Sequence, residues 1–348
     1  MEVKDSLQAI ELFYERGWTD GLPVIPPTEE LVAEMISYSG RDSGEITGAV
    51  PPSGGIATVE KVAINAVMAG CVPSYFPVVL AAVEASLEDR FSLNGVSVTT
   101  AGRVPLIIVN GPVAKQIGMN SGPNCFGQGN RANASIGRAL RLVHVNIGGA
   151  VPGEVDKSTF GHPGKFTFCI SENEDANPWE PYHVEKGFRR DDSTVALFAG
   201  DAPHHVSYGG YHTGASAEGV LVTMADALAN LGHSNMYYIT SEVLVIFSPL
   251  HAKIIAREGW SKRDVRLWLF DKARRSVSEL AKGGLYGREK WPKWLGEASD
   301  AVSVPFVKDP DDIMIIVAGG SGNHSVFLVP WMGRAVIRKI NITTEGGS

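Results

Sequence analysis

At 348 residues the chain is long enough for one large domain or two, and its 44% hydrophobic and 20% charged residues are typical of globular rather than disordered proteins. The net charge of −7 is spread along the chain without a basic stripe, which argues against nucleic-acid binding because Lys and Arg supply most of the affinity for phosphate. No stretch approaches the ~18 apolar residues of a membrane span, the N-terminus has no signal-like apolar core, and three widely spaced cysteines suit neither a disulfide framework nor a zinc knuckle. We therefore expect a cytoplasmic protein.

The N-terminal part predicts an amphipathic helix and then three further helices, separated by turn-rich segments. Residues 5–17 have an amphipathic pattern that a glycine ends. After the segment GWTDGLPVIPPT, Thr28 is placed to cap a helix over ELVAEMI, and Thr58 is placed to cap a second helix over VEKVAINAVMAG. Pro73 and Pro77 open a third helix, because proline is tolerated in the first helical turn.

Short apolar runs that end in Gly or Pro turns predict the strands. Three of them, at 105–112, 243–249 and 313–320, are rich in β-branched residues, and LVHVNIGG at 142–149 is a fourth candidate. Continuous apolar runs of this length, flanked by helices, are typical of buried strands in a parallel or mixed sheet. The expected fold class is therefore α/β, with such a sheet flanked by helices.

Two strand–helix stretches are similar to one another. LIIVNGPVAKQIGMNSG and VLVIFSPLHAKIIAREGWS share a strand, a proline, Ala-Lys, an isoleucine two residues later and a polar turn. This favours a weak internal duplication into two related βα lobes, although any two strand–turn–helix units share some of these features. We expect one compact unit over residues 1–348, with lobes at about 1–150 and 151–348. The basic stretch 262–275 is expected to be the solvated face of an amphipathic helix.

Ligands of open α/β sheets collect where the carboxyl ends of the strands meet their loops. These ends carry Asn110 after the first run, Ser248 with His251 after the second, and GGSGNHS at 319–325 after the third. A strand that runs into GGSGNHS exposes successive backbone N–H groups, which can hold an anion or oxyanion. The segment matches neither a Walker loop nor a dinucleotide fingerprint. We expect this loop to bind the ligand through Gly320, Ser321, Gly322 and Asn323. His324 is a candidate acid or base. A plain tight turn without a ligand remains the alternative.

The densest polar stretch is NSGPNCFGQGNRANASIGRAL at 120–140, which offers many hydrogen-bond donors with little bulk. Asn130, Arg131 and Asn133 are candidates for binding a carboxylate, phosphate or carbonyl group, with Arg131 as the anion clamp. Asparagines also stabilise turns, so a structural role stays open. Cys125 is a candidate nucleophile if a helix N-terminus or Arg131 stabilises its thiolate.

Carboxylates and an imidazole lie close together in residues 153–188, around a rigid Asn-Pro-Trp. Glu172 and Glu180 are candidates for moving protons, and Lys165 for neutralising an anion or a carboxylate. Because no ligand spacing is diagnostic, we expect no bound metal. The runner-up is a metal site made from this segment and the histidine-rich stretch 201–214, with four candidate ligands: Glu174, His183, His204 and His205.

The longest motifs of the chain resemble those of a widespread bacterial family that is associated with UGSC-motif (seleno)proteins. These motifs cover nearly the whole chain: GWTDGLPVIPPT, TVEKVAINAVMAGC, GMNSGPNCFGQGNRANASIGRAL, HPGKF with SENEDANPWEP, and GWSKRDV. UGSC proteins are similar to the redox selenoprotein component of glycine- and betaine-type reductases. The resemblance implies a multi-component enzyme whose UGSC-type partner brings a cysteine or selenocysteine redox pair, while this chain, which lacks CxxC, binds the substrate.

Three functions remain open at this point. The first is a substrate-binding or catalytic subunit of a thiol- or selenol-linked enzyme that acts on a small polar, anionic molecule. The second is a stand-alone hydrolase or lyase, with or without a metal. The third is a non-catalytic binding or scaffold subunit. The sequence identifies no cofactor, and we expect an oligomer.

Overall fold

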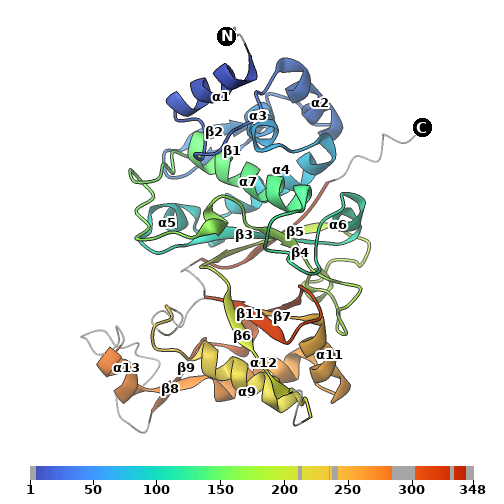
Figure 1. Cartoon of the computed structure of the whole chain (residues 1–348), viewed down its shortest axis with the longest axis vertical. Coiled ribbons are helices and arrows are strands. Elements are labelled where there is room, and N and C mark those ends of the chain that lie inside the picture. Colours follow the sequence, from blue (N-terminus) through green and yellow to red (C-terminus); the bar gives the residue numbers. More distant parts are fainter. Residues whose placement is uncertain are drawn as a thin grey trace.

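Four layers make up the molecule: helices, a sheet, a second sheet and further helices (Figure 1). Within the described part of the chain, no helix is long and apolar enough to cross a membrane. This computed structural model describes residues 5–210, 214–234, 236, 242–283, 302–329 and 333–341.

The first half of the chain forms the upper helices and most of one sheet. Its helices are α1 (Ser6–Glu15), α2 (Glu29–Ser39), α3 (Val59–Ala69), α4 (Phe76–Ser86), α5 (Leu93–Val98), α6 (Pro112–Gln116), α7 (Arg131–Asn146) and α8 (Tyr182–Glu185). Its strands are β1 (Ile46–Val50), β2 (Gly55–Thr58), β3 (Val104–Asn110), β4 (Cys169–Ser171) and β5 (Thr194–Gly200). The expected caps are confirmed, because the side chains of Thr28 and Thr58 accept from the backbone N–H of Leu31 and Lys61.

The second half forms the other sheet and the lower helices. Its helices are α9 (Ala217–Leu228), α11 (Pro249–Arg257), α12 (Lys262–Lys272) and α13 (Val277–Gly283). Its strands are β6 (His204–Ser207), β7 (Val243–Phe247), β8 (Arg274–Ser276), β9 (Ser303–Pro305), β10 (Ile313–Val317), β11 (His324–Leu328) and β12 (Val336–Lys339).

The two four-stranded sheets have the same topology. One has the order β4-β3-β5-β12 and the other β10-β7-β11-β6. In each, the central strand pairs in parallel with the first neighbour and antiparallel with the second, so the predicted α/β fold with a mixed sheet is confirmed. The fourth strand is exchanged: β6 follows β5 along the chain but joins the β7 sheet, and β12 follows β11 but joins the β3 sheet.

The equivalence of the sheets extends to single residues. Ile108 pairs with Ile170 on one side and Ala196 on the other, and Ile246 pairs with Ile316 and Val326 in the same way. In both sheets, the residue that follows the parallel edge strand (β4 or β10) donates its backbone N–H to the carbonyl of the last apolar residue of the central strand (β3 or β7). These bonds are Glu172 N to Val109 O and Ala318 N to Phe247 O, both 3.1 Å. Glu172 and Ala318 are therefore equivalent positions, as are Asn110 and Ser248.

Alternating side chains divide the interior into three apolar clusters. Residues such as Leu106 and Ile108 of β3 meet Leu244 and Ile246 of β7 in a cluster between the sheets. The alternate residues of each strand point to the helices instead. Ile107 of β3 lies in the cluster under the upper helices, and Val245 of β7 lies in the cluster under the lower helices. Because both faces of each sheet are covered, the central strands are apolar at nearly every position.

Three expectations need correction. Residues 142–149 are not a strand, because α7 runs on through Asn146 and its helical apolar spacing starts before this window. The basic helix α12 is not only solvated, since Lys262 and Arg266 are buried and both pair with Glu185. The first sheet continues to residue 200 and takes in β12, so the chain does not divide at about residue 150.

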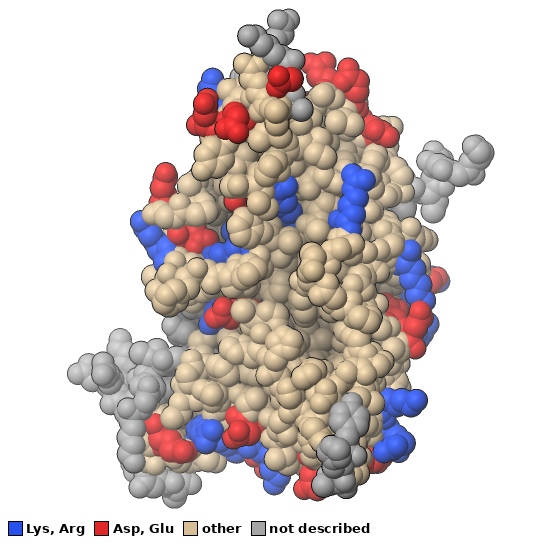
Figure 2. Space-filling view, in the orientation of Figure 1, with Lys and Arg blue, Asp and Glu red and all other residues tan. Residues whose placement is uncertain are grey.

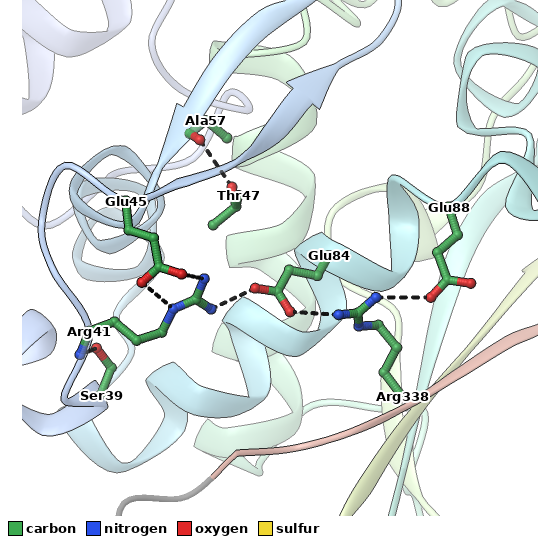
Figure 3. Close-up of polar contacts among 8 residues, drawn as sticks. All are labelled: Ser39, Arg41, Glu45, Thr47, Ala57, Glu84, Glu88 and Arg338. Atoms are coloured by element: carbon green, nitrogen blue, oxygen red, sulfur yellow. Dashed lines mark hydrogen bonds and ion pairs between the residues drawn. The ribbon is translucent and has the colours of Figure 1, made fainter.

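A ladder of alternating charges fastens the exchanged strand β12 to the upper helices (Figure 3). Arg338 of β12 donates to Glu84 at 3.2 Å and to Glu88 at 3.1 Å. Glu84 also accepts from Arg41 at 2.6 Å, and Arg41 makes a two-bond contact with Glu45. The ladder links β12, α4 and the loop after α2.

Candidate functional site

A cavity of about 920 Å³ lies at the carboxyl ends of β7 and β10. Four segments contribute most of its lining: 123–128, 162–168, 202–205 and 318–326. Segments 123–128 and 162–168 belong to the connections between β3 and β4 of the first sheet. Segment 318–326 joins β10 to β11 in the second sheet, and segment 202–205 leads into the exchanged strand β6. The size falls within the usual range of small-molecule sites.

The walls combine apolar surface with uncharged polar groups. Phe126, Phe168, Ile246 and Val326 supply much of the apolar part. None of the described lining residues is Asp, Glu, Lys or Arg. Their titratable side chains are one cysteine and three histidines: Cys125, His162, His205 and His324. Charged side chains are also sparse across the middle of the face drawn in Figure 2, and they gather toward its ends and edges. Such a cavity suits an organic molecule with little charge rather than a polyphosphate, which needs several cationic side chains.

Asn133, on α7, shapes the 120–128 wall. Its Oδ1 accepts from Asn120 N at 3.0 Å, and its Nδ2 donates to Asn120 O at 2.8 Å and to Cys125 O at 3.2 Å. Asn130 caps α7 by accepting from Asn133 N at 2.9 Å. Neither Asn130 nor Asn133 is among the cavity-lining residues, so both position the loop that carries Cys125.

The glycine loop after β10, residues 319–322, forms the adjoining wall. Gly319 has φ +92°, a conformation that favours glycine, and its N–H donates to Ser121 O at 2.8 Å. A Cβ on Gly320 would meet Pro123 at 3.1 Å, so this glycine allows the two loops to approach. No described residue accepts from the N–H of Gly320 or Ser321. The binding of an oxyanion by these N–H groups stays a prediction.

A chain of hydrogen bonds holds the glycine loop against α11. Ser248 Oγ donates to Gly322 O at 2.8 Å, and Ser248 N donates to Ser325 Oγ at 3.2 Å. Ser325 Oγ is in turn 2.7 Å from Nδ1 of His251, which is almost fully buried. Burial, aided by the nearby His324, lowers the pKa of His251 to about 4, so its ring is neutral near pH 7. The neutral ring fixes Ser325 and, through Ser248, the loop.

His205 and His324 face the cavity from neighbouring strands. Their ring centroids are 6.5 Å apart, and Nδ1 of His324 is 2.8 Å from Ser207 Oγ. The hydrogen bond to Ser207 occupies one ring nitrogen of His324 and leaves the other for proton exchange. His324 therefore lines the cavity, and its role as an acid or base stays a prediction. Asn323 is not among the lining residues, and its carbonyl accepts from Tyr208 N.

Cys125 lines the cavity but is not an activated thiol. Burial raises its pKa to about 11, against the opposing effect of hydrogen bonds from the backbone of Phe126, Cys125 itself and Gly319. At neutral pH the sulfur is therefore protonated. The stabilisation expected from Arg131 is not seen, because that guanidinium donates to Gly70 O through Nε at 3.1 Å and Nη2 at 3.0 Å.

The carboxylates predicted as proton carriers lie outside the cavity lining. Glu172 is buried at the carboxyl end of β4, where it accepts from Asn110 Nδ2 at 2.6 Å, Asn177 Nδ2 at 2.8 Å and Tyr182 N at 2.8 Å. Burial, the largest effect, raises its pKa. Glu180 is exposed and does not line the cavity. Lys165 is also outside the lining, and its Nζ pairs with Asp156 at 2.5 Å.

The four runner-up metal ligands are dispersed. Glu174 Oε1 is 3.9 Å from Nδ1 of the fully buried His183 and accepts from Gly111 N at 2.7 Å. His204 stacks on Phe327 on the helix side of β6, whereas His205 faces the cavity. Within the described ranges, no three His, Cys, Asp or Glu residues are grouped as metal ligands, and His212 lies outside those ranges.

Several cavity residues were not identified from the sequence. His162 lies in an irregular segment after α7. Phe168 directly precedes β4, and a strand of three residues is too short to give a sequence pattern. The signal that was present is His-Pro-Gly at 162–164, a rigid turn that places an imidazole. Burial lowers the pKa of His162.

Comparisons with known proteins add no family. A scan against models of protein families found no match, and a search of curated proteins found none either. The geometry of the cavity is therefore the basis for any functional conclusion.

Proposed function

We propose that this chain is the substrate-binding or catalytic subunit of a thiol- or selenol-linked enzyme, and that the 920 Å³ cavity holds its small organic substrate. The observation that carries the proposal is that the glycine loop and the His205–His324 pair line one largely apolar cavity. Donors fixed before binding stabilise developing negative charge at little reorganisation cost.

The protonated state of Cys125 supports a division of labour between two proteins. A thiol with a pKa of about 11 is a poor nucleophile at neutral pH, so this chain presents no activated sulfur in the cavity. The resemblance to UGSC-associated proteins supplies the complementary part, a partner that brings the reactive thiol or selenol. The substrate, held beside the histidines, would meet that group at the cavity.

The second candidate function is a lyase or hydrolase that works without the partner. The observation in its favour is the pair His205 and His324, since two imidazoles near one ligand are sufficient for acid–base catalysis.

One experiment separates the candidates. The wild-type chain and an Ala318→Phe variant, whose new ring fills part of the cavity, are each incubated with a library of small metabolites. Compounds retained by the wild type alone are identified by mass spectrometry, then followed with and without dithiothreitol as the thiol donor. Consumption that requires the thiol and is lost in His324→Ala supports the proposal.

Consumption at an equal rate without the thiol would instead favour the lyase or hydrolase. Retention without consumption under either condition would favour a binding subunit. If Ala318→Phe, folded by circular dichroism, retained the same compounds as the wild type, the cavity would not be the binding site.

A further inference from the structure

The equivalence of the two sheets gives the cavity a counterpart inside the same molecule. At the carboxyl end of β4, the equivalent of Ala318 is Glu172, and the equivalent of Ser248 is Asn110. Both ends lie on the faces that the sheets turn toward each other, since Ile170 and Ile316, two residues before these positions, belong to the cluster between the sheets. The comparison is therefore between two versions of one site.

The two versions differ in what fills them. In the β3–β4 version, the loop over residues 172–193 is long and places the Glu172 carboxylate in the interior. In the β7–β10 version, the loop over residues 318–323 is short, Ala318 has no side chain beyond Cβ, and the space remains as the cavity. Glu172 thus marks a position at which this architecture accommodates a carboxylate.

The Glu172 carboxylate is bound by neutral donors at short range. Asn110 Nδ2, Asn177 Nδ2 and Tyr182 N lie 2.6–2.8 Å from its oxygens, and Lys262 adds a favourable electrostatic interaction. These three hydrogen bonds and Lys262 favour the charged form of Glu172, while burial, the largest effect, raises the pKa of its carboxyl.

The equivalent position in the cavity is followed by backbone donors rather than by side-chain amides. The hydroxyl of Ser248, at the position equivalent to Asn110, donates to Gly322 O and so has no hydrogen left for a ligand. The backbone N–H groups of Gly320 and Ser321, two and three residues beyond Ala318, make no hydrogen bond to a described residue and are the donors nearest in sequence to this position. Beyond this end, Phe126, Phe168 and Ile246 provide apolar walls. One anionic head group thus has donors, and the rest of the ligand has apolar surface.

We propose that the cavity binds a monocarboxylic acid with an apolar body, and that the carboxylate of this ligand occupies the position equivalent to the Glu172 carboxylate. The inference rests on the proposed function for the existence of a ligand and names its chemical class. A single negative charge matches a lining in which the described side chains include no Lys or Arg.

The first test transplants the carboxylate. Ala318→Glu introduces at the cavity the side chain that the equivalent position carries, and Ala318→Gln is a matched control of the same size without charge. If donors for an anion are arranged there, the melting temperature of A318E at pH 7.5 will equal or exceed that of A318Q. A buried carboxylate without donors is strongly destabilising, so a melting temperature of A318E that is 2 °C or more below that of A318Q, about 1.5 kcal/mol in a chain of this size, overturns the proposal.

The second test uses ligands and does not depend on the folding of a variant. Isothermal titration calorimetry compares 4-phenylbutanoate with 4-phenylbutanamide, which has the same apolar body and no charge, on the wild-type chain. At least tenfold tighter binding of the carboxylate is expected, with loss of that binding in A318E. Equal or tighter binding of the amide contradicts the proposal.

The third test examines the counterpart. Glu172→Ala leaves the amide donors of Asn110 and Asn177 without their carboxylate, and acetate should restore part of the lost melting temperature while acetamide should not. Equal effects of the two additives contradict the view of Glu172 as a built-in carboxylate ligand. Failure of these tests leaves the proposed function standing if Ala318→Phe still abolishes retention of metabolites, so the two failures are distinguishable.

Discussion

His251 makes the stability of the fold depend on pH. Its pKa falls from 6.5 to about 4 in the folded chain, chiefly through burial, so between these values the unfolded chain binds a proton that the folded chain does not. The stability contribution is therefore complete above pH 6.5 and is lost as the pH falls toward 4, by up to about 3 kcal/mol.

His251→Asn tests this dependence. Asparagine places a polar atom near the position of Nδ1, which contacts Ser325, and it does not titrate. Urea unfolding at pH 7.5, 5.5 and 4.5 should show a flatter pH dependence for the variant than for the wild type. Other histidines with a lowered pKa, such as the partly buried His233, titrate in both proteins and cancel. Parallel curves for the two proteins would show that His251 is not the group responsible.

Arg131 is expected to stabilise the fold rather than to bind the ligand. Its two hydrogen bonds to Gly70 O join the start of α7 to the end of α3. Arg131→Lys cannot reproduce this planar two-bond contact, and because the site is exposed we expect a loss of about 0.5–1 kcal/mol in unfolding free energy. Retention of metabolites per folded molecule should not change. Weaker retention at an unchanged melting temperature would restore Arg131 as an anion clamp.

At the scale of elements, the charge ladder tests how firmly the exchanged strand is held. Arg338→Met removes both bonds from β12 to the region of α4, where the partner Glu84 is only partly exposed. After allowance for solvent screening, the expected loss of unfolding free energy is about 0.5–1.5 kcal/mol, and it should shrink in 1 M salt.

Arg189→Met is the matched control for Arg338→Met. Arg189 also makes a two-bond contact, to Asp191, but both side chains are mostly exposed. Its loss should change the unfolding free energy by less than about 0.5 kcal/mol. Similar effects of the two substitutions in urea unfolding would mean that the ladder does not anchor β12.

Elements with strong local signals were predictable from the sequence. The capped helices α2 and α3 and the apolar strands β3, β7 and β10 lie close to their expected positions, because side-chain caps and continuous burial act within a few residues. The error at 142–149 arose where a long helix contains a β-like window. The three-residue strand β4 has too little sequence to carry a pattern and forms through its pairing with β3.

The candidate site was predictable only in part, and the reason lies in the strand exchange. The glycine loop and the 120–128 loop, both singled out as ligand-binding candidates, meet in the structure, since Gly319 N donates to Ser121 O. Asn110 and Glu172 also follow strand ends, but those ends belong to the other sheet. A sequence pattern shows that a residue follows a strand and does not show which of two equivalent sheets contains that strand.

At the scale of the whole molecule, strand exchange predicts that the two sheets unfold together. Each sheet has an edge strand supplied across the molecule, and both share the apolar cluster between them. Hydrogen exchange in urea, resolved by mass spectrometry, should therefore give amides of β3 and β7 the same unfolding midpoint, as in a two-state transition.

Removal of β12 provides the decisive comparison. A chain that ends at residue 329 loses the buried side chains of Val336 and Ile340, whose contribution is at least about 3 kcal/mol. β12 pairs with β5 in the first sheet, so a fold made of independent lobes would lose protection in β3 alone. Coupling through the shared cluster instead predicts that the midpoints of β3 and β7 fall together. If β7 kept the midpoint of the full chain while β3 lost protection, the sheets would be separate folding units, and the exchanged strands would act as tethers rather than as parts of one core.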